Sequence, residues 1–270
     1  MKNIKFFALS IMLLGAVSCG PNIERGLVLH SDFERDARDL GPNHYDGFFR
    51  NGAEISDDCV VGESSVYLNG EGGYVEYPEG KVYFDGDYSV SIWVKWEECR
   101  LASRILDFNQ VMPQAGDAVS WFIGLPEEGT RNNLWLTQWT TADRVPVQSV
   151  HDISAVPSEA YLGYNVTPGQ WDHYVLVYSS SAKNPLGNQQ NEKGQKLPYR
   201  GKVTLYVNGE KVGENYHCFK PQPVPTVANW LGRSRYQSDP RFCGKMDDFR
   251  IYDRKLSEKE ILALYDLGAD

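Results

Sequence analysis

The stretch that decides the fold class is VTLYVNGEKVG, at residues 203–213. From Val203 to Val207 apolar residues alternate with others, which is the period-two pattern of a strand with one buried face. The dipeptide Asn208-Gly209 follows directly, and it tolerates the positive φ angles that both central residues of a type I′ turn require. The chain then resumes an extended pattern. The stretch therefore predicts an antiparallel hairpin.

The same alternation recurs outward from this hairpin. In YSVSIWVKW, residues 88–96, one face carries apolar side chains and the other carries two serines, Trp93 and Lys95. This pattern predicts a half-buried strand. Further strands, most of them bounded by Gly, Pro, Asn or Asp, are predicted at residues 26–33, 64–69, 73–77, 118–125, 133–141, 171–178 and 245–252.

One short helix is predicted at the C-terminal end. Ser257 and Glu260 have the spacing of a capping box, and Ile261, Leu264 and Tyr265 then share one stripe. The chain has 270 residues with 25 Gly, 14 Pro and 13% aromatic residues, which suits short strands joined by tight turns. We therefore expect one large all-β domain carrying a short helix.

The N-terminus resembles an export signal. Two lysines precede an apolar stretch from Phe6 to Val17, which is too short to span a bilayer. Ala16-Val-Ser-Cys19 resembles a bacterial lipobox, so we expect residues 1–18 to be removed and Cys19 to carry lipid. An ordinary cleaved secretory signal is the alternative. No later apolar run has the length of a membrane span, so lipid alone would attach the chain to a membrane.

The remaining chain is predicted to consist of a short tether at 19–25 and a domain at 26–270. Within that domain, residues 179–200 are polar and lack apolar periodicity, so we expect a long surface loop. The net charge is −9, and the linear sequence contains no cluster of Lys and Arg. Nucleic acid and anionic lipid surfaces are therefore not expected as partners.

Four cysteines remain if Cys19 is lipidated. An even number in an exported protein permits two disulfides in three possible connectivities. Cys218 and Cys243 are near in sequence and flank a single excursion, so this pair is favoured, and Cys59 pairs with Cys99 only by elimination. None of the four has the CxxC spacing of a zinc or redox site.

Seven segments together resemble a laminin-G-like domain of the concanavalin A-like lectin/glucanase superfamily. They are GLVLHSDFERDARDLGPNHYDGFF, SVYLNGEGGYVEYP, YSVSIWVKW, GQWDHYVLVY, VTLYVNGEKVG, LGRSR and FCGKMDDFRIYDRKLSEKEILALY, spread over residues 26–267. The resemblance implies a jelly-roll sandwich of two curved antiparallel sheets. That fold hosts lectins, carbohydrate-binding modules, glycoside hydrolases, polysaccharide lyases and adhesion modules, so it does not assign function.

No catalytic residue is predicted. The retaining glycosidases of this superfamily carry a Glu-x-Asp-x-x-Glu strand, and no candidate strand has this spacing. Adjacent pairs such as Glu97-Glu98 point to opposite faces of a strand. A HExxH helix, a GxSxG elbow, a P-loop and a GxGxxG fingerprint are also missing from the sequence. A lyase built from scattered Tyr, His and Arg residues would escape this search and stays an alternative.

A glycan-binding platform is predicted on the strand NLWLTQWTT, residues 133–141. Trp135 and Trp139 share a face opposite two inward leucines, about 13 Å apart by strand rise, a span of two to three sugar rings. Exposed indoles offer flat partners for the C–H faces of sugars. Trp93 would extend the platform if its strand lies in the same sheet. The alternative is that these residues are core, and the binding surface then moves to the loops carrying Trp230, Arg233 and Tyr236.

The resemblance also implies one structural calcium ion. Asp247 matches the acid of the closing strand, Asp32 or Glu34 the N-terminal acid, and Gly70 or Gly72 the carbonyl donor. Calcium takes six to eight oxygen ligands, which carboxylates and loop carbonyls supply. Solvated acids at strand ends are the alternative.

The sequence thus predicts a lipid-anchored bacterial surface protein that binds a poly- or oligosaccharide without catalysis. A glycoside hydrolase or polysaccharide lyase of the same fold is one alternative, and a protein-binding adhesion module is the other.

Overall fold

The computed structural model describes residues 20–82, 86–111, 118–124, 133–140, 158–190, 194, 196, 200–216, 218 and 228–269. For residues 109–111, 118–123, 133–140 and 158–162 it describes the backbone only. Cys19 and the predicted signal peptide lie outside these residues, so lipid anchoring stays a prediction. Within the described ranges, no helix has the length and apolar character needed to cross a membrane.

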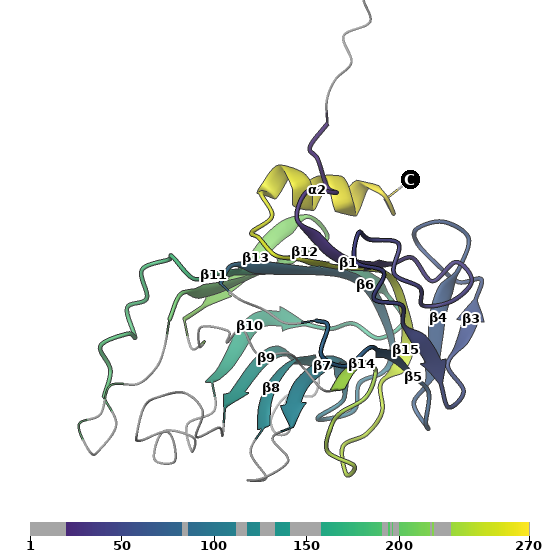
Figure 1. The fold of residues 1–270 in the computed structure, drawn as a ribbon, viewed down its shortest axis with the longest axis horizontal. Coiled ribbons are helices and arrows are strands. Elements are labelled where there is room, and N and C mark those ends of the chain that lie inside the picture. Colours follow the sequence, from purple (N-terminus) through teal and green to yellow (C-terminus); the bar gives the residue numbers. More distant parts are fainter. Residues whose placement is uncertain are drawn as a thin grey trace, which may run out of the picture.

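Two antiparallel sheets lie face to face (Figure 1). The first sheet has the order β13-β12-β11-β6-β15-β4-β3, and β1 pairs with β15 beside β4. Its strands are β1 (Leu27–Ser31), β3 (Glu54–Ser56), β4 (Ser65–Asn69), β6 (Tyr88–Glu98), β11 (Trp171–Ser179), β12 (Lys202–Val207), β13 (Glu210–Asn215) and β15 (Cys243–Tyr252).

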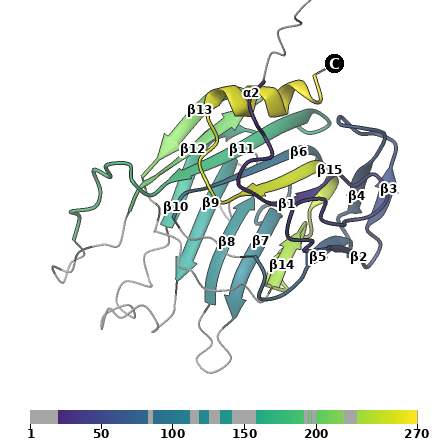
Figure 2. The same ribbon diagram turned by 45° about the horizontal axis from the view of Figure 1, so that its top comes forward.

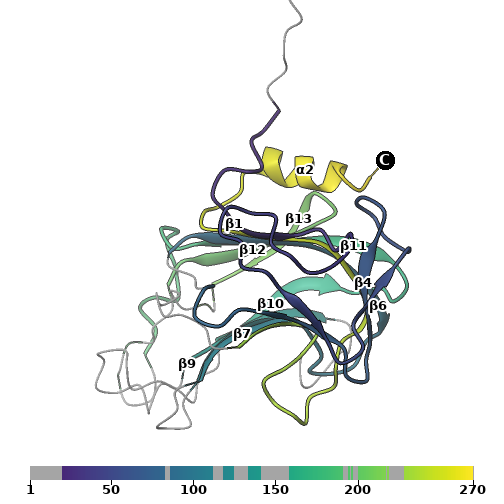
Figure 3. The same ribbon diagram turned by 45° about the vertical axis from the view of Figure 1, so that its right-hand side comes forward.

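The second sheet has the order β10-β9-β8-β7-β14-β5-β2. Its strands are β2 (Phe48–Arg50), β5 (Tyr74–Tyr77), β7 (Arg104–Val111), β8 (Ala118–Gly124), β9 (Asn133–Thr140), β10 (Ser158–Asn165) and β14 (Ala228–Leu231). Figure 3 shows the two sheets as stacked layers. The predicted all-β jelly-roll sandwich is confirmed.

The core between the sheets is built by the apolar faces of their central strands. Val90, Ile92, Val94 and Trp96 of β6 are at most 1% exposed and belong to this core. β7 and β14 contribute from the opposite sheet. The predicted alternation in β6 is therefore correct for its inner face.

The expectation that β6 is half-buried is wrong, because its outer face is covered as well. Ser89, Ser91 and Trp93 on that face are buried. The helix α2 (Glu258–Asp266) lies across the outer face of the first sheet (Figure 2). Its buried residues Ile261 and Leu264 form a second apolar cluster with residues of β11 and β15. The predicted capping box of Ser257 and Glu260 is present.

The predicted hairpin is formed by β12 and β13. Asn208 and Gly209 have φ angles of 51° and 80°, as a type I′ turn requires. The Asn208 side chain also anchors the turn to β11, since its Oδ1 accepts the N–H of His173 and its Nδ2 donates to Asp172. Asn208 therefore both adopts the backbone conformation of the turn and attaches the turn to the sheet.

The predicted Cys218–Cys243 disulfide is wrong. The Cys218 thiol donates to the carbonyl of Arg200, just before β12, at the end of the sheet where β6 begins. Cys243 pairs with Glu98 at the other end of β6, which is roughly 33 Å away by strand rise. A disulfide requires Cα atoms within about 7 Å. All four cysteines of the described residues are free thiols: Cys59, Cys99, Cys218 and Cys243.

Candidate functional site

The outer face of the second sheet carries the candidate site, where β5, β14 and β7 lie side by side. Trp230 of β14 pairs with Glu76 on one side and Asp107 on the other. Residues directly opposite each other in an antiparallel pair point to the same face. Their neighbours Leu231 and Val75 are fully buried in the core. Trp230, Glu76 and Asp107 therefore point away from the core.

Arg233 follows β14 and lies against two aromatic rings. Its guanidinium carbon is 4.1 Å from the centre of the Trp230 ring and 4.6 Å from that of Tyr74. The indole N–H of Trp230 donates to Glu76, and Glu76 accepts a second bond from Arg50 at 2.7 Å. The orientation of the Trp230 ring is thus held from β2 and β5.

A buried ion network lies beside these rings. Arg104 is 1% exposed and donates to Asp107 through Nη1 and to Asp239 through Nη2, the latter at 2.9 Å. Asp107 also accepts the backbone N–H of Arg235, and Asp239 accepts the hydroxyl of Ser234. These bonds fix the loop after β14 onto β7.

The exposed member of the site is Tyr236, whose side chain is 41% exposed. The guanidinium carbons of Arg104 and Arg235 lie 5.4 Å and 4.8 Å from its ring centre. We call the whole group the arginine–aromatic cluster, and it consists of Tyr74, Arg104, Trp230, Arg233, Arg235, Tyr236 and Arg241.

The cluster combines flat aromatic surface with guanidinium donors. Its two carboxylates, Asp107 and Asp239, are both held by Arg104. A pair of carboxylates engaged in this way stabilises the loop after β14. The arrangement fits recognition of a ligand with apolar faces and hydrogen-bond acceptors.

Comparison with known proteins assigns the chain to a family. The model of the Laminin_G_3 family, described as the concanavalin A-like lectin/glucanases superfamily, matches residues 69–262. The chain belongs to this family. A comparison with curated proteins found no match.

Solved structures share the fold of this Laminin_G_3 chain. Domain 4 of AbnA, a GH43 extracellular arabinanase from Geobacillus stearothermophilus in complex with arabinotriose, has a TM-score of 0.61 and 21% identity over 90% of this chain and 98% of that one. The binding domain of Paraclostridial Mosquitocidal Protein 1 has a TM-score of 0.58 and 18% identity over 90% of this chain. The botulinum neurotoxin serotype D/C binding domain has a TM-score of 0.61 and 12% identity over 92% of this chain. The chain spans about half of each toxin domain, 52% and 53%.

The structure of this Laminin_G_3 chain brings Trp230, Arg233 and Tyr236 together, but it separates Trp93 from them. Trp93 is 3% exposed and lies on the outer face of the first sheet. Its ring stacks on His173 at 4.9 Å and on Tyr265 of α2 at 5.6 Å between ring centres. The prediction that Trp93 extends a binding platform is wrong, because the helix covers it.

Trp135 and Trp139 lie on a strand, as predicted, and this strand is β9 of the second sheet. Their backbones pair with Gly124 and Ser120 of β8. Their side chains lie outside the described part of the chain, so the platform on β9 stays a prediction. Trp93 belongs to the other sheet and cannot share a surface with them.

Of the residues predicted to bind calcium, Gly70 lies apart from Asp247. Gly70 lies next to Cys243 at the start of β15, so about 13 Å of strand separates it from Asp247. Its carbonyl accepts from Arg100. Asp32 accepts the N–H of Glu34. Within the described ranges, no three His, Cys, Asp or Glu side chains are grouped as metal ligands. Calcium binding by Asp247 with Asp32 or Glu34, and with Gly72 as the carbonyl donor, stays a prediction.

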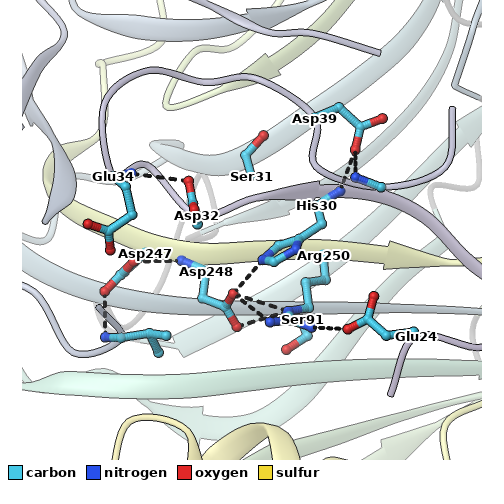
Figure 4. Close-up of polar contacts among 12 residues, drawn as sticks. Glu24, His30, Ser31, Asp32, Glu34, Asp39, Ser91, Asp247, Asp248 and Arg250 are labelled. Carbon is cyan, nitrogen blue, oxygen red and sulfur yellow. Dashed lines mark hydrogen bonds and ion pairs between the residues drawn. The ribbon is translucent and has the colours of Figure 1, made fainter. Parts of the chain in front are cut away.

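Asp247 is occupied by backbone donors. Its carboxylate accepts the N–H groups of Val60 and Val61 at 2.9 Å each and that of Asp248 at 2.8 Å (Figure 4). Burial raises the pKa of Asp247 to about 7, although these three donors oppose the shift. Its role is to hold the loop that precedes β4 against the closing strand.

Next to it, the sequence analysis missed a buried network on the first sheet. Asp248 accepts hydrogen bonds from Nε and Nη2 of Arg250 and pairs with Nε2 of His30 at 2.8 Å (Figure 4). Arg250 and His30 face each other across β15 and β1, and Glu24 reaches Arg250 from the N-terminal segment. This network fastens β1 to its neighbour β15 within the first sheet.

Proposed function

We propose that this Laminin_G_3 chain binds carbohydrate without catalysis and that the arginine–aromatic cluster is its glycan site. The observation that carries the proposal is the combination of an exposed Tyr236 with half-buried Trp230 and Arg233 on the outer face of one sheet. Sugar rings pack their C–H faces on aromatic rings. Guanidinium groups donate hydrogen bonds to the surrounding oxygens in a fixed fork.

The comparisons support a binding role for the fold. Domain 4 of AbnA holds arabinotriose, and it has nearly the same length as this chain. The toxin structures of this fold are described as binding domains or receptor-binding domains. A binding module needs an ordered recognition surface, which the buried Arg104–Asp107–Asp239 network supplies here.

The cellular setting is also a proposal. Cys19 carries lipid after removal of residues 1–18, and the domain then captures glycans at a bacterial membrane, at the outer membrane or cell surface. The lipobox-like Ala16-Val-Ser-Cys19 supports it. Mass spectrometry of the exported protein tests it, because an intact residue 1 or cleavage at another bond would contradict lipid anchoring.

The glycan site is tested first with Tyr236→Ala. We expect glycan affinity to fall about tenfold, which corresponds to about 1.4 kcal/mol, because one stacking ring is lost. The free energy of unfolding should change by less than about 0.5 kcal/mol, since Tyr236 is exposed. Binding is measured on a glycan array and by calorimetry with the glycan that the array selects.

Leu262→Ala is the matched control. Leu262 is 49% exposed but lies on α2, over the other sheet, so its truncation should leave binding unchanged. A reducing-sugar assay runs beside the array. New reducing ends would replace the proposal by a glycoside hydrolase or lyase, and retention of no glycan would favour the adhesion module.

A further inference from the structure

The arginine–aromatic cluster contains more positive charge than its carboxylates neutralise. Within the described part of the chain, five arginines lie in or beside it with three carboxylates: Arg50, Arg104, Arg233, Arg235 and Arg241 with Glu76, Asp107 and Asp239. Arg50 forms an ion pair with Glu76, and Arg104 forms ion pairs with both Asp107 and Asp239. In a chain of net charge −9, this is a local positive surplus.

The surplus is concentrated on Arg233 and Arg241. Within the described residues, neither guanidinium forms an ion pair, and Nε of Arg233 and Nη1 of Arg241 are buried without a hydrogen-bond partner. Among the described residues, the faces of Trp230 and Tyr74 hold the Arg233 guanidinium in place. Burial and the nearby charge of Arg233 lower the pKa of Arg241.

Burying two guanidinium groups without a hydrogen-bond acceptor lowers the stability of the fold. A buried donor that lacks a partner costs about 1–3 kcal/mol, and more when it is charged. An anion placed between the two groups would accept from both and remove their mutual repulsion. Arginine suits this task because its planar fork matches a carboxylate or a sulfate with two parallel hydrogen bonds.

The rings beside the two arginines restrict the class of anion. Trp230 and Tyr74 flank Arg233, and Tyr236 flanks Arg235. A ligand that fills this site therefore presents an apolar face next to its negative charge, as a charged sugar ring does. Nucleic acid fits poorly, because its many phosphates would meet the acidic remainder of the chain.

Resting on the proposed function, we infer that the glycan of this site is acidic and that Arg233 and Arg241 together bind the carboxylate or sulfate group of one sugar unit.

The test compares glycans that differ only in charge. Oligogalacturonate is measured against its methyl ester, and a sulfated galactan against its desulfated form, by calorimetry with the purified protein. We expect the charged member of at least one pair to bind ten- to a hundredfold more tightly, because hydrogen bonds between charged partners contribute about 1.5–3 kcal/mol. The pair that shows the difference identifies carboxylate or sulfate as the recognised group.

Arg233→Gln and Arg241→Gln should each remove most of this preference, measured as the ratio of the affinities for the charged and the neutral member of the pair. Arg233→Lys keeps the charge without the fork, so it should restore only part of the affinity. Arg38→Gln is the control, because Arg38 is an exposed arginine whose ion pair with Asp36 lies outside the cluster.

Each outcome separates the inference from the proposed function. Equal binding of charged and neutral glycans, with loss of binding in Tyr236→Ala, would overturn the acidic ligand and keep the glycan site. A charge preference that survives both glutamine variants would place the anion elsewhere. Tight binding of polyglutamate with no glycan retained would overturn both and assign the site to an acidic protein segment.

Discussion

Asp248→Asn will lower the free energy of unfolding by about 3–5 kcal/mol, because it removes the buried counter-charge of Arg250 and leaves only the exposed Glu24 at 3.5 Å. Asp248 is 1% exposed and Arg250 is 5% exposed, and two guanidinium nitrogens of Arg250 donate to the carboxylate. Asparagine has nearly the same size, and it tolerates the positive φ of 44° at this position. The loss of unfolding free energy therefore comes from the missing charge and not from backbone strain. Urea denaturation followed by tryptophan fluorescence measures it.

The double variant Asp248→Asn, Arg250→Met separates a charge effect from a loss of packing. Removing both charges should recover much of the stability, so the two substitutions should be strongly non-additive. Asp36→Asn is the matched control: its pair with Arg38 is exposed on both sides, and it should change stability by less than about 1 kcal/mol. Additive losses at Asp248 and Arg250 would show that the pair is not coupled.

The sequence predicted those elements that depend on residues close together in the chain. The hairpin at Asn208-Gly209 follows from backbone preference, and the capping box at Ser257 follows from side-chain reach within one turn. The inner face of β6 follows from alternation over consecutive residues. These features need no knowledge of which strands become neighbours.

Features that depend on strand order could not be predicted in this way. Alternation marks Trp93 as lying on the polar face of β6, but it does not show that α2 covers that face. Cys218 and Cys243 are near in sequence, yet the chain leaves the first sheet for β14 between them and returns at its opposite end. The distance between Gly70 and Asp247 has the same cause, since the antiparallel register places Gly70 at the start of β15, away from Asp247.

The candidate site was predictable in part. Trp230, Arg233 and Tyr236 lie within one short segment, so their proximity follows from the sequence. Arg104 and Asp107 come from β7, a strand that the sequence analysis did not identify. Three arginines between residues 233 and 241 are the signal that could have indicated a charged site earlier.

The second large effect is a loss of folding stability at low pH. His173 is fully buried beneath α2, where its Nε2 bonds to the hydroxyl of Ser91 and its ring stacks on Trp93. Burial lowers the pKa of His173 to about 3, with Arg250 acting in the same direction and Asp248 against it. Its pKa in the unfolded chain is about 6.5. The unfolded state therefore binds this proton first, and the stabilisation that is complete above pH 6.5 is lost as the pH falls toward 3.

His173→Gln isolates this effect, because glutamine keeps a polar contact for Ser91 but does not titrate. Asp247 acts in the opposite direction, since its raised pKa adds stability as the pH falls from about 7 to 4. Its contribution is present in both proteins and cancels when their unfolding free energies are subtracted.

The stability advantage of the native histidine over glutamine should shrink by about 3 kcal/mol between pH 6.5 and 4, near 1.4 kcal/mol for each pH unit. Urea denaturation of the native protein and of His173→Gln across this range measures it. Parallel curves for the native protein and His173→Gln would show that His173 takes up its proton without opening the structure beneath α2.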